Sequence, residues 1–222
     1  MVLRFHFIFS VLLGLLPLTA PLSLSFAGVS DPAKAEVDLV LARYRKAKAI
    51  RAKVKKKVVQ QIMGTESESR GEFFFSKGKL RLDINHPESS VLVYDGKNIW
   101  MESRLDESSI EVTKIPSSNL RKADSLLAAL FERKDVLKNF KTLENKKADD
   151  LKIYSFEPID TRTTEVRFLE IAISGKEIER ITYKDSRENL VSFEFADLTR
   201  GSVPSSKFSY SPPKNASVTV MK

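Results

Sequence analysis

Short stretches in which apolar and polar residues alternate dominate this sequence. Leu80, Leu82 and Ile84 alternate with charged or polar neighbours, and Phe193 and Phe195 do the same. A period of two is typical of a β-strand with one buried face. Turn-forming pairs separate such stretches at short intervals: Lys77-Gly78, His86-Pro87, Asp95-Gly96, Ser174-Gly175 and Asp185-Ser186. Because turns this short connect antiparallel neighbours, the sequence predicts a β meander.

Two segments depart from this alternation. From Ala35 to about Val54, apolar residues recur every three or four positions after Asp31-Pro32, which suits a helix start. Between Asn119 and about Leu143, after Pro116, the apolar spacing predicts one or two short helices. The sequence therefore predicts an α+β fold with one curved antiparallel sheet, covered by an N-terminal helix and short inserted helices.

The first residues have the pattern of a secretory signal. Arg4 precedes an apolar run over residues 7–18, and Ser25-Phe26-Ala27 has the small-x-small form that signal peptidase accepts. We expect cleavage after Ala27, so that residues 1–27 are a signal peptide. A retained membrane anchor is the alternative, but Pro17 and Pro21 disfavour a membrane-spanning helix.

Cleavage would leave residues 28–222 as a single exported domain. It would remove one positive charge and lower the net charge from +8 to +7. Gly28 would then be the first residue, and the chain has no cysteine that could accept a lipid. We therefore expect a protein that is not itself anchored to a membrane.

Enzymatic chemistry has little support in the sequence. The absence of cysteine excludes disulfides, thiolate metal sites and a thiol nucleophile. His86 is the only histidine after residue 27, and it lies in a predicted turn. The carboxylates lie in mixed-charge patterns, such as Asp106-Glu107, without a glycine-rich phosphate loop. We predict no enzyme, no metal and no cofactor.

Nine cations occur between Arg43 and Lys57. They could form the solvated face of the first helix and of the next strand, or they could dock on a membrane or a partner. The sequence leaves both interpretations open, but export disfavours nucleic acid.

The predicted strands carry a wide apolar face, and Phe208 and Tyr210 near the C-terminus are predicted to belong to its late strands. This face could be ordinary core, or it could hold an acyl chain in a half-closed barrel. We expect the following residues to bind lipid: Phe73, Phe75, Leu80, Leu82, Ile84, Val91, Val93, Ile99, Met101, Phe168, Phe193 and Phe195.

Two motifs resemble those of one family. The segment Pro87–Trp100 is similar to the P-x-x-S-x-x-V-x-D-G-x-x-x-W segment of the outer-membrane lipoprotein carrier (LolA) family. The segment Lys207–Pro213 resembles that family's terminal F-x-F-x-P-P. Between them, residues 181–195 lie where the family has its late hairpin, and residues 118–140 take the place of its covering helices.

This resemblance implies an incomplete, half-open β-barrel closed by helices. It implies a monomeric periplasmic carrier that shields the acyl chains of lipoproteins on their way from the inner to the outer membrane. The implied partners are acylated lipoproteins, an inner-membrane ABC-type release complex and an outer-membrane lipoprotein receptor.

The resemblance also suggests how the cavity would close. Leu126, Leu130 and Phe131 are the expected lid residues, which would fill the cavity when it is empty. Family members commonly carry an Arg-Pro pair in the early hairpin, where the arginine ties the lid closed. Here Lys77-Gly78 stands in about that place, so Lys77 is the candidate gate, with a looser hold than a planar guanidinium.

Two other functions remain compatible with these residues. A protein of similar fold could sense mislocalised lipoproteins and signal through a partner. The same apolar face could also carry another lipid.

Overall fold

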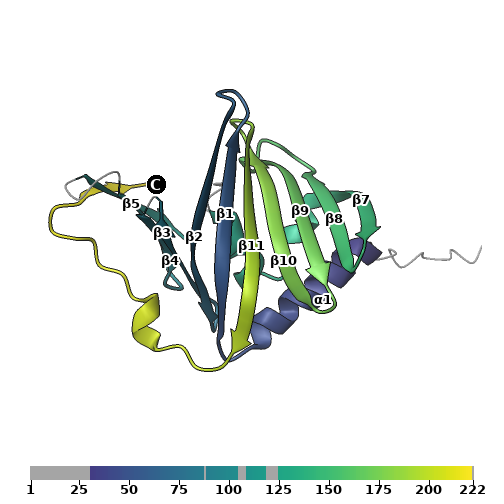
Figure 1. Cartoon of the computed structure of the whole chain (residues 1–222), viewed down its shortest axis with the longest axis horizontal. Coiled ribbons are helices and arrows are strands. Elements are labelled where there is room, and N and C mark those ends of the chain that lie inside the picture. Colours follow the sequence, from purple (N-terminus) through teal and green to yellow (C-terminus); the bar gives the residue numbers. More distant parts are fainter. Residues whose placement is uncertain (1–30, 88, 105–108, 119–124, 222) are drawn as a thin grey trace, which may run out of the picture.

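A computed structural model describes residues 31–87, 89–104, 109–118 and 125–221, and the predicted signal peptide lies outside these residues. One continuous twelve-stranded sheet has the order β12-β6-β5-β4-β3-β2-β1-β11-β10-β9-β8-β7 (Figure 1). Its strands are β1 (Ile50–Gln60), β2 (Thr65–Ser76), β3 (Lys79–His86), β4 (Ser89–Tyr94), β5 (Asn98–Arg104), β6 (Ile110–Pro116), β7 (Phe140–Ala148), β8 (Leu151–Pro158), β9 (Val166–Ser174), β10 (Glu177–Asp185), β11 (Asn189–Arg200) and β12 (Ser217–Val220).

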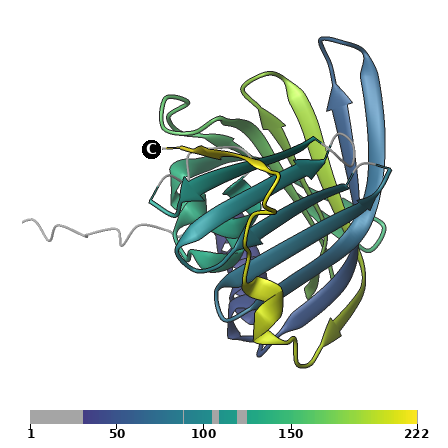
Figure 2. The ribbon, with the colours of Figure 1, turned by 90° about the vertical axis from the view of Figure 1, so that its left-hand side faces the viewer.

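The sheet is curved and unclosed, with β12 and β7 as its two edges (Figures 1 and 2). Neighbouring strands are antiparallel, except that β12 pairs with β6 in parallel. The five predicted turns at Lys77-Gly78, His86-Pro87, Asp95-Gly96, Ser174-Gly175 and Asp185-Ser186 all lie between consecutive strands. The predicted α+β fold with an incomplete barrel is therefore confirmed.

Helices cover the concave side of the sheet. They are α1 (Pro32–Lys46), α2 (Leu126–Glu132) and the short 3-10 helix η2 (Val136–Asn139), while a second 3-10 helix, η3 (Ser205–Phe208), lies near the C-terminus. In the described part of the chain, no helix is long and apolar enough to cross a membrane.

The N-terminal helix starts where the sequence predicts. The Asp31 side chain accepts hydrogen bonds from the backbone N–H groups of Ala33 and Lys34, and Pro32 occupies the first turn. The predicted end near Val54 is wrong, because α1 ends at Lys46 and β1 begins at Ile50. Ile50, Ala52 and Val54 are buried and alternate with exposed cations, so the four-residue spacing of Ile50 and Val54 fits a strand equally well.

Gly71 in β2 lies where two backbones approach closely. A Cβ atom at this position would be 1.8 Å from the carbonyl oxygen of Asp83 in β3. We expect Gly71→Ala to lower the free energy of unfolding by about 2 kcal/mol, because the strands must separate locally. Urea denaturation measures this loss. Gly201→Ala is the control, because a Cβ there meets nothing within 4 Å, and an equal loss in both variants would contradict the steric explanation.

Asp95 organises the β4–β5 turn. Its Oδ1 accepts hydrogen bonds from the backbone N–H groups of Lys97 and Asn98, both at 2.8 Å, and its Oδ2 accepts one from the Trp100 indole at 3.0 Å. Burial alone raises the pKa of Asp95, but these hydrogen bonds outweigh it, so the pKa lies below its ordinary value.

This shift predicts a pH dependence of stability. Because the pKa of Asp95 is lower in the folded than in the unfolded chain, its contribution is complete above about pH 5 and is lost as the pH falls below about 4. We expect the difference in unfolding free energy between wild type and Asp95→Asn to shrink over this range. Urea denaturation at a series of pH values measures it, and a pH-independent difference would refute the assignment.

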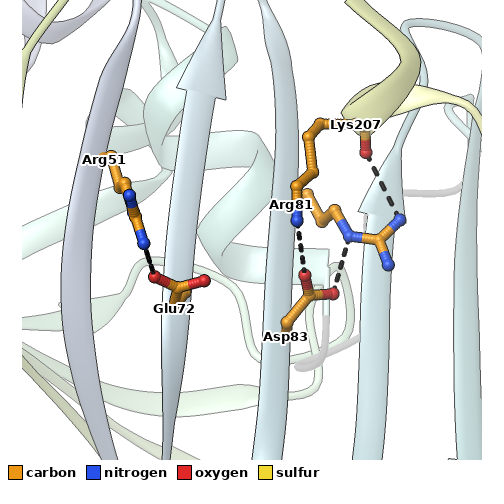
Figure 3. A network of polar contacts seen from close by, with 5 residues as sticks. All are labelled: Arg51, Glu72, Arg81, Asp83 and Lys207. Atoms are coloured by element: carbon orange, nitrogen blue, oxygen red, sulfur yellow. Dashed lines mark hydrogen bonds and ion pairs between the residues drawn. The ribbon is translucent and has the colours of Figure 1, made fainter. Parts of the chain in front are cut away.

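The C-terminal segment crosses the convex face of β2–β5 before it forms β12 (Figure 2). The Arg81 Nε donates to Asp83 at 2.6 Å, and an Arg81 terminal nitrogen donates to the Lys207 carbonyl at 3.3 Å (Figure 3). The Lys207 ammonium lies 3.8 Å from the other Asp83 oxygen. In the same picture, Arg51 of β1 pairs with Glu72 of β2. Polar contacts thus hold this segment on the outside of the sheet.

Two aromatic residues of this segment correct a prediction. Phe208 is buried in η3, and Tyr210 follows it in irregular structure, so neither lies in a strand. The Tyr210 hydroxyl donates to Glu102 at 2.6 Å, and its ring lies 5.5 Å from that of Trp100. Burial and this hydrogen bond raise the pKa of Tyr210. The side chains of Phe208 and Tyr210 therefore help to cover the convex face.

Candidate functional site

Strand register decides which predicted lipid-binding residues face the concave side. Phe73 pairs with Leu82 and with Ala52, and the Leu82 row continues through Leu92 to Met101. Nine of the twelve predicted residues belong to the apolar cluster on this side or pack against it. These nine are Phe73, Phe75, Leu80, Leu82, Ile84, Ile99, Met101, Phe193 and Phe195.

The other three predicted residues take alternate positions on the convex face. Val91 pairs with Asp83, Val93 pairs with Arg81, and Phe168 pairs with Lys184. Val93 and Phe168 therefore lie on the face away from the pocket described below, whereas Val91 borders it, and lipid binding by these residues stays a prediction. In β4 the apolar residues are consecutive, so a period of two could not show which of them faces inward.

Leu92 is the concave residue of β4 that the sequence analysis missed. It pairs with Leu82 and Met101, and it lines the pocket. Its neighbours Val91 and Val93 are equally apolar, and only the register of β4 against β3 distinguishes the three.

A pocket of about 250 Å³ with both apolar and polar walls opens on the concave face. Leu82, Leu92, Met101 and Phe193 from four strands meet Leu127 of α2 there. The remaining wall is more polar and consists of Lys56, Ile84, Ser90, Val91, Glu102, Ser103, Glu111, Thr113 and Tyr183. Ligand pockets are usually lined mostly by apolar side chains and start at about 300 Å³, whereas about half of the side chains that line this pocket are polar.

Helix α2 occupies the interior next to this pocket. Leu126, Leu130 and Phe131 are at most 5% exposed, so the predicted helix exists and buries all three residues. The Phe131 ring lies 5.1 Å from Phe73, 5.4 Å from Tyr44, 5.8 Å from Phe75 and 6.4 Å from Phe195. A helix of seven residues has little stability of its own, so these contacts hold it in place.

Arg45, in the last turn of α1, bonds the C-terminal end of α2. One terminal nitrogen of its guanidinium donates to the carbonyls of Leu130 and Arg133, both at 3.1 Å. The other donates to the Asp38 carbonyl at 3.4 Å. Because the last carbonyls of a helix lack partners within the helix and carry partial negative charge, a cation stabilises them.

Lys77, the predicted gate, lies elsewhere. It is exposed in the β2–β3 turn at φ 48°, and it lines a separate pocket of about 200 Å³ with Lys48, Lys79 and Phe208. For the part of the chain that the structure describes, the hydrogen bonds recorded to the Leu130 and Arg133 carbonyls come from Arg45. The resemblance placed the gate at Lys77 because of its position in the hairpin. The residue that bonds α2, Arg45, belongs instead to the basic run between Arg43 and Lys57.

Most of the basic run in β1 forms ion pairs on the convex face. Lys53 pairs with Asp197 at 2.7 Å, and Lys55 pairs with Glu194 at 2.8 Å. Lys57 pairs with Glu66 at 2.7 Å. These contacts favour the solvated-face interpretation for β1. Among the described residues, no group of three or more His, Asp or Glu side chains is close enough to hold a metal ion.

Comparisons with known proteins agree with this architecture. Residues 45–211 match the family model of the outer membrane lipoprotein carrier protein LolA. An uncharacterized conserved protein from Thermus thermophilus shares the fold, with a TM-score of 0.51 and 12% identity over 86% of this chain and 100% of the other. A LolA superfamily protein from Nitrosomonas europaea gives a TM-score of 0.45 and 13% identity over 80% of this chain and 97% of its own. No curated protein matches this sequence.

Proposed function

Because this chain belongs to the outer membrane lipoprotein carrier protein (LolA) family, we propose that it is a periplasmic carrier that encloses the acyl chains of lipoproteins. The observation that supports this most is the pocket on the concave face, which has an apolar floor and is bordered by a short buried helix. LolA-family proteins bind lipids or lipoproteins and are not enzymes.

The pocket suits cargo that is recognised by its apolar character. Transfer of an acyl chain out of water is favourable by about 0.8 kcal/mol per methylene, so binding needs few specific polar contacts. To admit a chain, α2 must leave the interior, since Leu130 and Phe131 occupy the space. The empty carrier closes on its own apolar residues, and this competition keeps the affinity low enough for release.

Transport in one direction needs a donor and an acceptor. We propose that an inner-membrane ABC-type complex delivers the lipoprotein and that an outer-membrane receptor accepts it. Export through a signal peptide cleaved after Ala27 would place the carrier between the two membranes, and residues 28–222 would then act as one domain.

The direct experiment is to purify the protein from its native periplasm and identify what it carries by mass spectrometry. Triacylated proteins support the proposal. Free lipid alone would instead support a carrier of another lipid. In parallel, titration with a synthetic triacylated lipopeptide should show binding, and the same peptide without acyl chains should show none. Equal behaviour of the two peptides, as expected of a sensor that reads the protein part, would refute the proposal.

We expect Met101→Trp to weaken lipopeptide binding by about tenfold. Met101 is half-buried and faces the pocket, so an indole there takes up space that an acyl chain needs. Fluorescence titration with a labelled lipopeptide measures the affinity. Ile159→Trp is the matched control, because Ile159 is 64% exposed and does not line the pocket. An unchanged affinity in Met101→Trp would show that the pocket is not the acyl site.

A further inference from the structure

The tip of the β1–β2 hairpin exposes two adjacent apolar side chains. Ile62 is 81% exposed and Met63 is 70% exposed, the highest values for large apolar residues among those the structure describes. A hydrogen bond of 3.1 Å from the Met63 N–H to the Gln60 carbonyl and a left-handed Gly64 at φ 64° shape the turn. Figures 1 and 2 both show this hairpin projecting beyond the neighbouring strands.

The tip lies at the same end of the barrel as the pocket. Lys56 in β1 borders the pocket and precedes Ile62 by six residues, which corresponds to about 20 Å of strand. Val58, between them, packs against the core on the concave side. The concave face of β1 thus leads from the pocket toward the tip.

Most charged side chains near this end of the hairpin have partners of opposite charge, with Arg70 beside Glu68 and Lys56 bordering the pocket. Lys57 pairs with Glu66, and Lys55 pairs with Glu68 as well as Glu194. Residues 60–65 carry no charge. The tip itself is therefore an uncharged segment that offers apolar contact, and a partner for it must accept apolar side chains on a projecting turn.

A lipid bilayer is the partner that fits these features. Two side chains on a projecting turn cover much less than the roughly 800 Å² per partner of a specific protein interface. The boundary between headgroups and acyl chains accepts such side chains without a shaped pocket. We propose that Ile62 and Met63 insert into the surface of the bilayer, an inference that rests on the proposed function because it brings the pocket to the membrane that supplies or receives the acyl chains.

A site-specific probe tests this insertion. Because the chain has no cysteine, Met63→Cys can be labelled with an environment-sensitive nitrobenzoxadiazole dye. We expect phosphatidylcholine vesicles to raise its emission and shift it to the blue, and brominated lipid to quench it. The same dye at Leu39→Cys, a position that is 67% exposed on α1, should respond to neither. A signal that needs anionic lipid and disappears in 0.5 M NaCl would overturn apolar insertion.

Substitution provides the second test. We expect Ile62→Ser with Met63→Ser to lower the vesicle-bound fraction at least about fivefold in sedimentation. Leu39→Ser with Leu143→Ser removes comparable exposed apolar surface elsewhere and should leave binding within about twofold. Equal losses in the two double variants would refute a specific role of the tip. Self-association of the wild type without vesicles, abolished by the tip substitutions, would assign the tip to a second copy instead.

The two proposals fail in different ways. Residues 61–64 do not line the pocket, so the tip variant should keep wild-type affinity for the acylated peptide. If wild type binds no acylated peptide, the carrier function fails whatever the vesicles show. If it binds the peptide but the dye at residue 63 does not respond to vesicles, only the insertion proposal fails.

Discussion

Replacing Phe131 with alanine is expected to lower the free energy of unfolding by about 3–4 kcal/mol. The Phe131 side chain is 1% exposed and contacts four aromatic rings, so its loss removes apolar contacts and leaves a cavity inside the barrel. Chemical denaturation measures the change. A loss below about 1 kcal/mol would show that α2 does not contribute to the stability of the empty protein.

The proposed carrier role adds a second expected result to this substitution. The cavity left by Phe131→Ala lies where an acyl chain would displace the ring, so a bound lipopeptide should recover part of the lost stability. The rise in melting temperature on adding lipopeptide should therefore be larger in Phe131→Ala than in wild type. Ile115→Ala, which empties a buried site on β6, is the control and should gain no extra ligand effect. An equal gain in both variants would contradict the lid role.

Replacing Arg45 with methionine is expected to strengthen lipopeptide binding by about tenfold. Arg45 bonds the Leu130 and Arg133 carbonyls only while α2 lies inside the barrel, so its loss removes stabilisation from the closed state alone. Hydrogen bonds to charged groups contribute about 1.5–3 kcal/mol each, less where they are partly exposed, and 1.4 kcal/mol corresponds to a factor of ten. The apparent affinity rises with the fraction of open molecules.

The hydrogen bonds from Arg45 to the Leu130 and Arg133 carbonyls would act as a latch on α2, and two measurements distinguish this latch from a purely structural role. The lipopeptide should dissociate more slowly from Arg45→Met, and the backbone amides of α2 should exchange hydrogen faster in the empty variant. Lys77→Gln tests the residue that the sequence analysis selected, and we expect it to behave like wild type. If Lys77→Gln strengthens binding and Arg45→Met does not, the hairpin lysine is the gate.

The sequence predicts where the strands begin and end better than it predicts which side of each strand faces the interior. Turn pairs such as Asp95-Gly96 and Ser174-Gly175 mark the strand ends because their backbone geometry is decided locally. The face of Val93 could not be predicted because both faces of β4 are covered, one by the core and the other by the C-terminal segment, so both are apolar. The orientation of a strand depends on its register with distant neighbours, which local patterns do not encode.

Arg45 illustrates a second limit. Its partners are backbone carbonyls 85 and 88 residues away, and a carbonyl leaves no mark in a sequence because every residue has one. Cations with carboxylate partners, such as Lys57 with Glu66, can be anticipated once strands are paired. The hydrogen bonds from Arg45 to α2 can be identified only from the packing of α1 against α2 in the structure.

The unpaired edges of the sheet have a mechanical consequence. Since β12 and β7 end the sheet, their separation can change by bending and twisting of the strands without breaking a ladder hydrogen bond. In a closed barrel, strand number and stagger fix the diameter. Here the width of the interior can change, which would let the proposed carrier adjust to acyl chains of different number and thickness at an elastic cost that grows gradually with the size of the cargo.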